Sequence, residues 1–334
     1  MTNAADATGI LIISHGSPRD EANRGFADLV ERIAARLGVG DVLPAFFSIA
    51  RPNIPDQVAA LAARGLRRIV LMPYFLYSGQ HVVVDIPAQL AECREQFPQV
   101  MIELLPTLEN DPALEDLVVE RLTPLVADET ALPSDGQAIE ERSYQIIDRQ
   151  LQGRVIADPA ARQIIRRIIH ATADVSFART LAIDPHAVER GQAALAAGKP
   201  ILCDVRMVQA GITKTRNEVV CLIDDEEVVA MARQNGITRA AAAMEKFVPR
   251  LDGAIVAVGN APTALWKVME IARRGGPRPA LVVGLPVGFV GARESKLALI
   301  RSGLCYITNT SARGGSPVAA AVVNALAMLN QREQ

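Results

Sequence analysis

Short apolar runs alternate with amphipathic stretches through the first third of the chain. The run at 10–13 is continuous and apolar, which is typical of a strand buried on both faces. Similar runs predict strands at 42–47, 68–76 and 101–105, and helical periodicity follows each strand, at 26–37, 55–63, 86–97 and 112–125. Four β-α units predict a parallel sheet with helices on both faces, and such sheets bind ligands at the carboxyl ends of their strands.

The same alternation resumes after a polar interval. Residues 127–137 lack periodicity and contain proline and glycine, so they predict a linker between a domain at 1–126 and a second at 138–334. Strands at 200–205, 218–223, 254–258, 280–285 and 306–308, with helices between them, predict a Rossmann-like α/β domain. The strand at 254–258 leads directly into a helix that begins near Pro262. The free N–H groups at the start of this helix can hold a carboxylate.

Composition narrows the class of protein. The chain has 334 residues, half of them hydrophobic, which is enough for two cores. No apolar run is long enough to span a bilayer, and the first residues do not resemble a signal peptide. The four cysteines are scattered without a CxxC pair, so we expect reduced, buried thiols in a cytoplasmic protein without a membrane partner.

Charge is divided unevenly along the chain. Residues 1–126 contain 10 basic and 16 acidic side chains, whereas the remainder contains 25 basic and 21 acidic ones. This division indicates a cation as ligand for the first part and an anionic substrate for the second. The basic residues form no run and few aromatic residues lie among them, so nucleic acid is not expected as a partner.

A helix predicted from Asp158 and Pro159, at its N-cap and first position, carries the densest candidate chemistry. Arg166 and Arg167 precede His170 by four and three residues, so both guanidinium groups can lie beside the imidazole. Two unpaired cations would favour the neutral ring, whereas an acidic substrate on the arginines would let it hold a proton. The alternative is a structural histidine that interacts with the last carbonyls of its helix.

Two more histidines follow predicted strands. His15 lies directly after the first strand and His81 lies beyond the third, so the two face one cleft if those strands are neighbours. Two neutral imidazoles can form a metal site with open coordination positions. The alternative is that both are surface hydrogen-bond donors, the commoner role of a loop histidine. A phosphohistidine enzyme is a further alternative, but Ser14 stands where that chemistry would need a phosphate-binding cation.

The first part resembles a known family in several motifs. The strings Ser14-His15-Gly16-Ser17, Phe75-Leu76-x-x-Gly79-x-His81 and Asp85-Ile86-Pro87 are similar to those of short-form sirohydrochlorin cobaltochelatases, over about residues 9–126. The resemblance implies that His15 and His81 are ligands of the incoming metal ion, and that His15 also accepts a pyrrole proton. Short chelatases dimerise to complete their cleft, which implies a homodimer or a higher even oligomer here.

Glycines after strands in the second part first suggest a dinucleotide-binding domain. Gly284, Gly288 and Gly291 do not fit GxGxxG, however, and Gly259 has no glycine two residues later, so nicotinamide or flavin binding is not favoured. Tight packing of helix on sheet explains these glycines equally well.

The second part instead resembles precorrin-8X methylmutases over about residues 138–328. The resemblance rests on several separate strings in the right order: Glu141-Arg142-Ser143, Arg167-Ile168-Ile169-His170, Ile201-Leu202-Cys203-Asp204, Thr238-Arg239, Gly259-Asn260-Ala261-Pro262-Thr263 and Pro286-Val287-Gly288-Phe289-Val290-Gly291-Ala292. It implies migration of a methyl group from C11 to C12 of a corrinoid ring without an organic cofactor. It also implies that His170 donates or accepts a proton and that Ser143, Arg167 and Arg239 contact the substrate.

Together the two resemblances imply a bifunctional enzyme of cobalamin biosynthesis. The first domain would insert Co²⁺, as a substrate, into sirohydrochlorin, and the second would isomerise cobalt-precorrin-8 to cobyrinate, or precorrin-8 to hydrogenobyrinate. Two alternatives for the first domain stay open. It can be a non-catalytic module that binds metal or tetrapyrrole, or a chelatase for nickel or iron.

Overall fold

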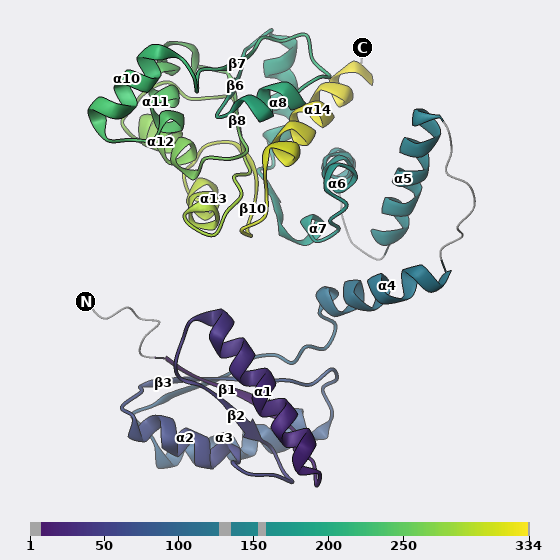
Figure 1. Ribbon diagram of the computed structural model, residues 1–334, viewed down its shortest axis with the longest axis vertical. Helices are drawn as coiled ribbons and strands as arrows, with labels where there is room; N and C mark the ends of the chain where they lie inside the picture. Colours follow the sequence, from purple (N-terminus) through teal and green to yellow (C-terminus); the bar gives the residue numbers. More distant parts are fainter. Residues whose placement is uncertain (1–7, 127–134, 153–157, 333–334) are drawn as a thin grey trace. The chain divides into compact units, whose positions relative to one another are not determined.

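The computed structural model describes residues 8–126, 135–152 and 158–332. The chain divides into two compact units, 1–128 and 129–334, each built on its own sheet. Figure 1 shows helices on both sides of each sheet. Most of the predicted linker, 127–137, falls outside the described residues, and its last two positions already belong to a helix.

The first unit contains the four predicted β-α units. Its sheet has the strand order β2-β1-β3-β4, with all neighbours parallel. The elements are β1 (Thr8–Ser14), α1 (Asp20–Leu37), β2 (Val42–Phe46), α2 (Ile54–Ala63), β3 (Arg68–Pro73), the π-helix η1 (His81–Asp85), α3 (Ile86–Gln96), β4 (Met101–Leu104) and α4 (Pro112–Val126). Because β1 pairs with β3, the strands that precede His15 and His81 are neighbours, which the cleft hypothesis required.

Alternation of side chains along the strands sets the two cores of this unit. Leu11 and Ile13 of β1 pack with Leu71 of β3 under α2 and α3. Ile12, between them, points to the other face and packs with Val30 of α1. A strand that is buried on both faces needs a continuous apolar run, and this is why the run at 10–13 predicted it correctly.

The second unit is a six-stranded sheet with the order β5-β10-β9-β8-β6-β7. Every pair is parallel except β10 with β5. The elements are α5 (Gly136–Gln150), α6 (Pro159–Thr172), α7 (Phe177–Thr180), β5 (Leu181–Ile183), α8 (Ala187–Ala196), β6 (Ile201–Cys203), α9 (Arg206–Gly211), β7 (Val219–Cys221), α10 (Glu226–Asn235), α11 (Arg239–Lys246), η2 (Val248–Arg250), β8 (Ile255–Val258), α12 (Pro262–Arg273), β9 (Leu281–Gly284), α13 (Ala292–Ile300), β10 (Tyr306–Asn309) and α14 (Ser316–Arg332).

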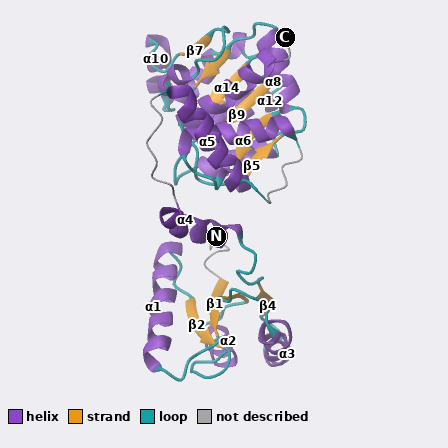
Figure 2. Cartoon of the chain, turned by 90° about the vertical axis from the view of Figure 1, so that its right-hand side faces the viewer, coloured by secondary structure: helices purple, strands orange, loops and turns teal. Residues whose placement is uncertain are grey.

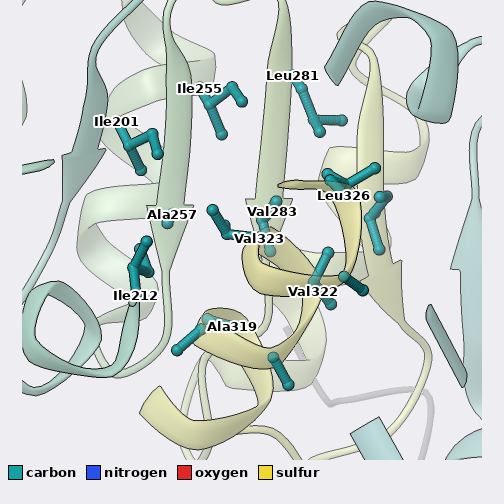
Figure 3. Close-up of a cluster of buried hydrophobic side chains, with 14 of the residues drawn as sticks. Ile201, Ile212, Ile255, Ala257, Leu281, Val283, Ala319, Val322, Val323 and Leu326 are labelled. Atoms are coloured by element: carbon teal, nitrogen blue, oxygen red, sulfur yellow. The ribbon is translucent and has the colours of Figure 1, made fainter. Parts of the chain in front are cut away.

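Helices cover both faces of this sheet (Figure 2). On one face α14 supplies small and β-branched residues, which pack on Ile255, Leu281 and Val283 of the central strands (Figure 3). On the other face α11 and α12 cover Val256, Val258 and Val282. The antiparallel strand β5 has only three residues, and its pattern in the sequence is too short to reveal it.

Two further expectations concern the whole chain. All four cysteines are free and buried, as predicted. Among the helices of the described residues, none combines the length and apolarity needed to cross a membrane.

Candidate active sites

His15 lies at the carboxyl edge of the first sheet, in the turn that follows β1. The turn is tied to the neighbouring strand, because Phe47 N donates to Ser14 O at 2.8 Å and Ser48 N donates to His15 O at 3.2 Å. Gly16 has a φ of +87°, and a Cβ there would lie 3.0 Å from the backbone nitrogen of Ala50. The glycine after His15 is therefore required by the turn, and the turn presents the half-buried imidazole at the strand end.

His81 begins the π-helix η1, after the loop that leaves β3. The structure describes its backbone but not its side chain, so the predicted pairing with His15 stays a prediction. The loop before it is attached to the segment after β4: Ser78 N donates to Glu109 Oε2 at 2.9 Å, and Ser78 Oγ lies 3.0 Å from Thr107 Oγ1. Within the described residues, no group of three or more His, Cys, Asp or Glu side chains is arranged to hold a metal ion.

Exposed apolar side chains surround the same edge of the first sheet. They follow β2 and β3 or belong to η1, and they are Ile49, Tyr74, Leu76, Tyr77, Val83 and Val84. Tyr77 is 78% exposed and Val83 63% exposed, so the exposed apolar side chains form a group at this edge. The edge thus offers an apolar surface beside an imidazole, and a flat macrocycle fits such a surface chemically.

The His170 helix α6 is anchored at both ends. Asp158 caps it, as predicted, by accepting from Ala160 N at 2.9 Å, and Pro159 occupies its first position. Beyond its C-terminus, Asp174 forms an ion pair with Arg313. Thr310 N donates to Thr180 O at 2.8 Å. Both contacts join the segment after α6 to the segment after β10, so His170 lies near the carboxyl edge of the second sheet.

His170 is held by two consecutive residues of α5. Ser143 Oγ lies 2.8 Å from His170 Nδ1, and the ring of Tyr144 stacks on the imidazole with centroids 5.1 Å apart and planes inclined by 29°. A hydrogen bond at Nδ1 fixes the orientation of the ring and leaves Nε2 as the nitrogen for exchange with a ligand. Ser143, which the resemblance places on the substrate, thus contacts the histidine as well.

The two arginines before His170 are paired with carboxylates of α5. Arg166 Nη2 lies 3.1 Å from Asp148 Oδ2, and its guanidinium lies 4.5 Å from the centre of the Tyr144 ring. Arg167 Nη1 donates to Glu140 Oε1 at 2.6 Å and to Tyr144 Oη at 2.9 Å. The premise of unpaired arginines beside His170 is therefore wrong, because α5 supplies a carboxylate to each.

The Glu140–Arg167 pair is charged at neutral pH. Partial burial would raise the pKa of Glu140, but the hydrogen bond and the positive charge of Arg167 outweigh burial and hold that pKa below its usual value. A small cavity of about 30 Å³ adjoins this pair and is lined by Tyr144, Gln163, Arg167, Ala325, Met328 and Leu329. It holds about one water, so a large ligand of Arg167 must lie outside it or displace side chains of α5.

Arg239 begins α11, on the other face of the sheet. Its Nη1 lies 3.4 Å from Asp224 Oδ1, and the same carboxylate binds Arg206 Nε at 2.8 Å. Side chains of both Arg239 and Asp224 are about half exposed, at 55% and 51%. Such a pair is weak and easily exchanged for another carboxylate. Among the described residues Arg239 makes no hydrogen bond or ion pair with the His170 cluster, so the two are separate groups.

A carboxylate of the chain itself lies at the turn before α12. Asp204, buried at the end of β6, accepts from Gly259 N at 3.0 Å, Asn260 N at 2.8 Å and Ala261 N at 2.7 Å. Burial raises the pKa of Asp204, and the three backbone N–H groups oppose that rise. Of these three donors only Ala261 N belongs to the N-terminus of α12, so the turn before the helix binds a carboxylate of the chain itself, and a ligand carboxylate at the first turn of α12 stays a prediction.

A buried lysine lies at the same edge of the sheet. Lys296 of α13 has no exposed surface, and its Nζ donates to Arg313 O at 2.6 Å. Asn309 Nδ2 donates to the same carbonyl at 3.0 Å. Burial lowers the pKa of Lys296 to about 8. Among the described residues Lys296 forms no ion pair with a carboxylate, and its ammonium group donates to the Arg313 carbonyl.

Four of the residues that shape this unit were not singled out from the sequence: Glu140, Tyr144, Asp204 and Lys296. For α5 a signal existed, because Glu140, Tyr144 and Ile147 recur at helical spacing and predict one face. Asp204 lies within a string that supported the resemblance and Lys296 lies four residues after another, but nothing in the local pattern indicates their partners, which lie 55 residues and 17 residues away.

Fold and site together define a class of protein. A doubly wound sheet with a polar cluster at its carboxyl edge is typical of α/β enzymes that act on anionic ligands. The chain belongs to the precorrin-8X methylmutase family, whose model matches residues 138–329. The CbiX family model matches residues 9–125.

Relatives support the same assignment for the C-terminal unit. The precorrin-8X methylmutase of Pseudomonas aeruginosa is 44% identical over 200 residues, which cover 58% of this chain and 95% of the relative. The cobalt-precorrin-8 methylmutase of Priestia megaterium is 38% identical over 198 residues, covering 58% and 88%. The crystal structure of precorrin-8X methylmutase from Thermus thermophilus superposes with a TM-score of 0.55 at 42% identity, covering 59% of this chain and 98% of that one. Both resemblances stated from the sequence are thereby confirmed.

Proposed function

We propose that the C-terminal unit isomerises precorrin-8, with or without cobalt, by moving a methyl group from C11 to C12 of the ring. The observation that carries the proposal is the cluster on α5 and α6 inside the family match, where Ser143 and Tyr144 hold His170 and Arg167 lies one turn away. An internal rearrangement needs a fixed orientation and one proton donor, and it consumes no redox equivalent.

The proposal assigns a role to each of these residues. His170 exchanges a proton with the ring through Nε2, since Ser143 engages Nδ1. Arg167 and Arg239 bind carboxylates of the substrate, which a guanidinium does bidentately. Tyr144 supports the plane of the imidazole and binds Arg167 through its hydroxyl.

For the N-terminal unit we propose insertion of Co²⁺ into sirohydrochlorin, with the metal ion as a substrate. His15 and His81 would hold the incoming ion, and His15 would accept a pyrrole proton. The exposed apolar side chains at the strand ends beside His15 support the proposal, because they suit a flat macrocycle. Nickel or iron as the metal, and a module that only binds, are the competing functions. Like short chelatases, the enzyme would work in the cytoplasm as a homodimer or a higher even oligomer.

Both activities are tested on the full chain by visible spectroscopy. Precorrin-8, alone and with cobalt, is incubated with the protein, and the corrin product is followed by its absorption change. In parallel, sirohydrochlorin is offered with Co²⁺, Ni²⁺ or Fe²⁺ and the rate of insertion above the uncatalysed rate is measured. No acceleration with any metal would leave the first unit as a binding module. No corrin product would refute the methylmutase assignment.

A further inference from the structure

Glu140 forms an ion pair with Arg167, the arginine that the proposed function assigns to a substrate carboxylate. Its Oε1 lies 2.6 Å from Arg167 Nη1. The Arg167 side chain is only 18% exposed, whereas the Glu140 side chain is 42% exposed. The arginine is thus fixed in the fold, and its partner is the more accessible member of the pair.

The need for a partner arises from the burial of Arg167. A guanidinium that is largely removed from water is unfavourable without an acceptor of opposite charge. Tyr144 Oη accepts a second hydrogen bond from the same Nη1, but a phenol hydroxyl carries no charge. Among the described residues Glu140 is the carboxylate that neutralises Arg167, and Arg167 in turn keeps the pKa of Glu140 low.

Because Glu140 neutralises Arg167, it also weakens the binding of a second carboxylate to that arginine. An arriving carboxylate is attracted by Arg167 but repelled by Glu140, so the net attraction of the pair is small. Binding regains the full attraction when Glu140 turns away into solvent, which its exposure permits. The ligand then supplies the negative charge that the half-buried arginine requires.

The two helices that carry the pair are joined by a small core. Ile147 of α5 and Leu151, which follows the end of α5, pack on Ile165 and Ile169 of α6. This core lies C-terminal to Glu140 on α5, about two turns away at Ile147, so release of Glu140 from Arg167 leaves it in place.

We propose that Glu140 is a stand-in carboxylate, which holds Arg167 in the absence of ligand and is displaced by a carboxylate of the corrinoid. This inference rests on the proposed function of Arg167 as a carboxylate clamp. It assigns to Glu140 a role opposite to that of an ordinary binding residue, because its removal strengthens binding.

The test is the affinity of the full chain for cobyrinate, measured by visible titration in wild type and in Glu140→Gln. Glutamine keeps the size and a hydrogen-bond acceptor but removes the charge, so we expect binding to tighten by about fivefold, the upper range for a partly exposed pair. Glu141→Gln is the matched control. Glu141 is the next residue on α5, is exposed, and accepts a hydrogen bond from Gln137 Nε2 at 3.0 Å. It should change affinity by less than about twofold.

A double-mutant cycle assigns the effect to Arg167. Arg167→Ala should weaken binding, and Glu140→Gln added to Arg167→Ala should have no further effect. Thermal unfolding is the second readout: Glu140→Gln should lower Tm without ligand, and the increase of Tm on adding cobyrinate should exceed that of wild type.

The possible outcomes distinguish the stand-in role of Glu140 from the carboxylate-binding role of Arg167. Weaker or unchanged binding in Glu140→Gln, together with weaker binding in Arg167→Ala, overturns the stand-in role and leaves the clamp intact. An equal gain in Glu141→Gln reduces the effect to general charge and also overturns it. Unchanged binding in Arg167→Ala refutes the clamp itself, and with it the basis of the inference.

Discussion

The two units place candidate histidines near the carboxyl edges of their sheets and surround them differently. His15 follows a parallel strand and lies among exposed apolar side chains; backbone hydrogen bonds and the side chain of Asn23 fix its turn, and its ring lies 5.9 Å from that of Phe47. His170 is held at one ring nitrogen and on one face by side chains of a neighbouring helix. Both lie at carboxyl edges of α/β sheets, as this architecture favours.

This difference corresponds to the chemistry proposed for each unit. A chelatase must release its metal, so ligands must leave coordination positions open and the surface must admit a macrocycle. An isomerase must hold one proton donor against a defined ring carbon, which favours groups fixed by packing and hydrogen bonds. The number of side chains that hold each histidine thus fits its proposed ligand: a metal ion that must be released in one unit, and a substrate that must be held in a fixed orientation in the other.

The strongest way to break the comparison is a reciprocal pair of variants. His170→Ala should lower methylmutase turnover by on the order of 10²-fold or more, as expected for a general acid, while cobalt insertion is unchanged. His15→Ala should abolish insertion above the uncatalysed rate while methylmutase turnover is unchanged. Both activities are measured on each full-length variant. Loss of both activities in either variant would show that the sites are shared or that the chain has misfolded.

The next effect concerns the arginine clamp of the second unit. Arg167→Ala should weaken corrinoid binding by about 1.5–3 kcal/mol, which is typical of hydrogen bonds to charged groups. Arg167→Lys should restore only part, because a lysine lacks the planar fork. Arg162→Ala, on the same helix and paired with Asp148, is the control and should bind normally. Titration of each variant with cobyrinate gives the comparison, and equal affinities for Arg167→Ala and wild type would assign Arg167 to structure.

A third effect concerns the stability that hydrogen bonds to Asp204 contribute at the edge of the second sheet. Asp204→Asn replaces a carboxylate that accepts three backbone N–H groups by an amide with one acceptor oxygen. At least one buried N–H group loses its partner, so the free energy of unfolding should fall by about 2 kcal/mol. Urea unfolding measures the loss. Asp252→Asn, at an exposed position, should stay within about 0.5 kcal/mol of wild type. Equal stability of both variants would contradict the account.

The last effect is a pH dependence of stability that Lys296 contributes. Its pKa in the fold is about 8, below the ordinary value of 10.5, so between these values the unfolded chain holds more protons than the native one. Stability from this residue therefore rises with pH across that window, by at most roughly 1 kcal/mol per pH unit. The difference between wild type and Lys296→Met, from urea unfolding at pH 7.5 to 10, isolates the contribution of Lys296. A constant difference would mean that Lys296 titrates normally.

Local patterns in the sequence were sufficient for the elements of the fold. Continuous apolar runs marked the buried strands, because a strand covered on both faces has no polar side. Asp158 and Pro159 marked the start of α6, because a cap acts within a few residues of itself. The three-residue strand β5 escaped this reading, since its antiparallel pairing with β10 depends on residues more than a hundred positions away.

Only the tertiary structure decided which partners the candidate residues have. The sequence alone placed two arginines beside His170, but α5 supplies their carboxylates and the support of the imidazole. The turn before α12 binds a carboxylate, and this carboxylate is that of Asp204, 55 residues before Gly259 in the sequence. Helix and strand formation depend on interactions between near neighbours along the chain. Which charged groups pair depends on their distance in space. That distance is set by the packing of whole helices and strands, so residue spacing along the sequence does not reveal it.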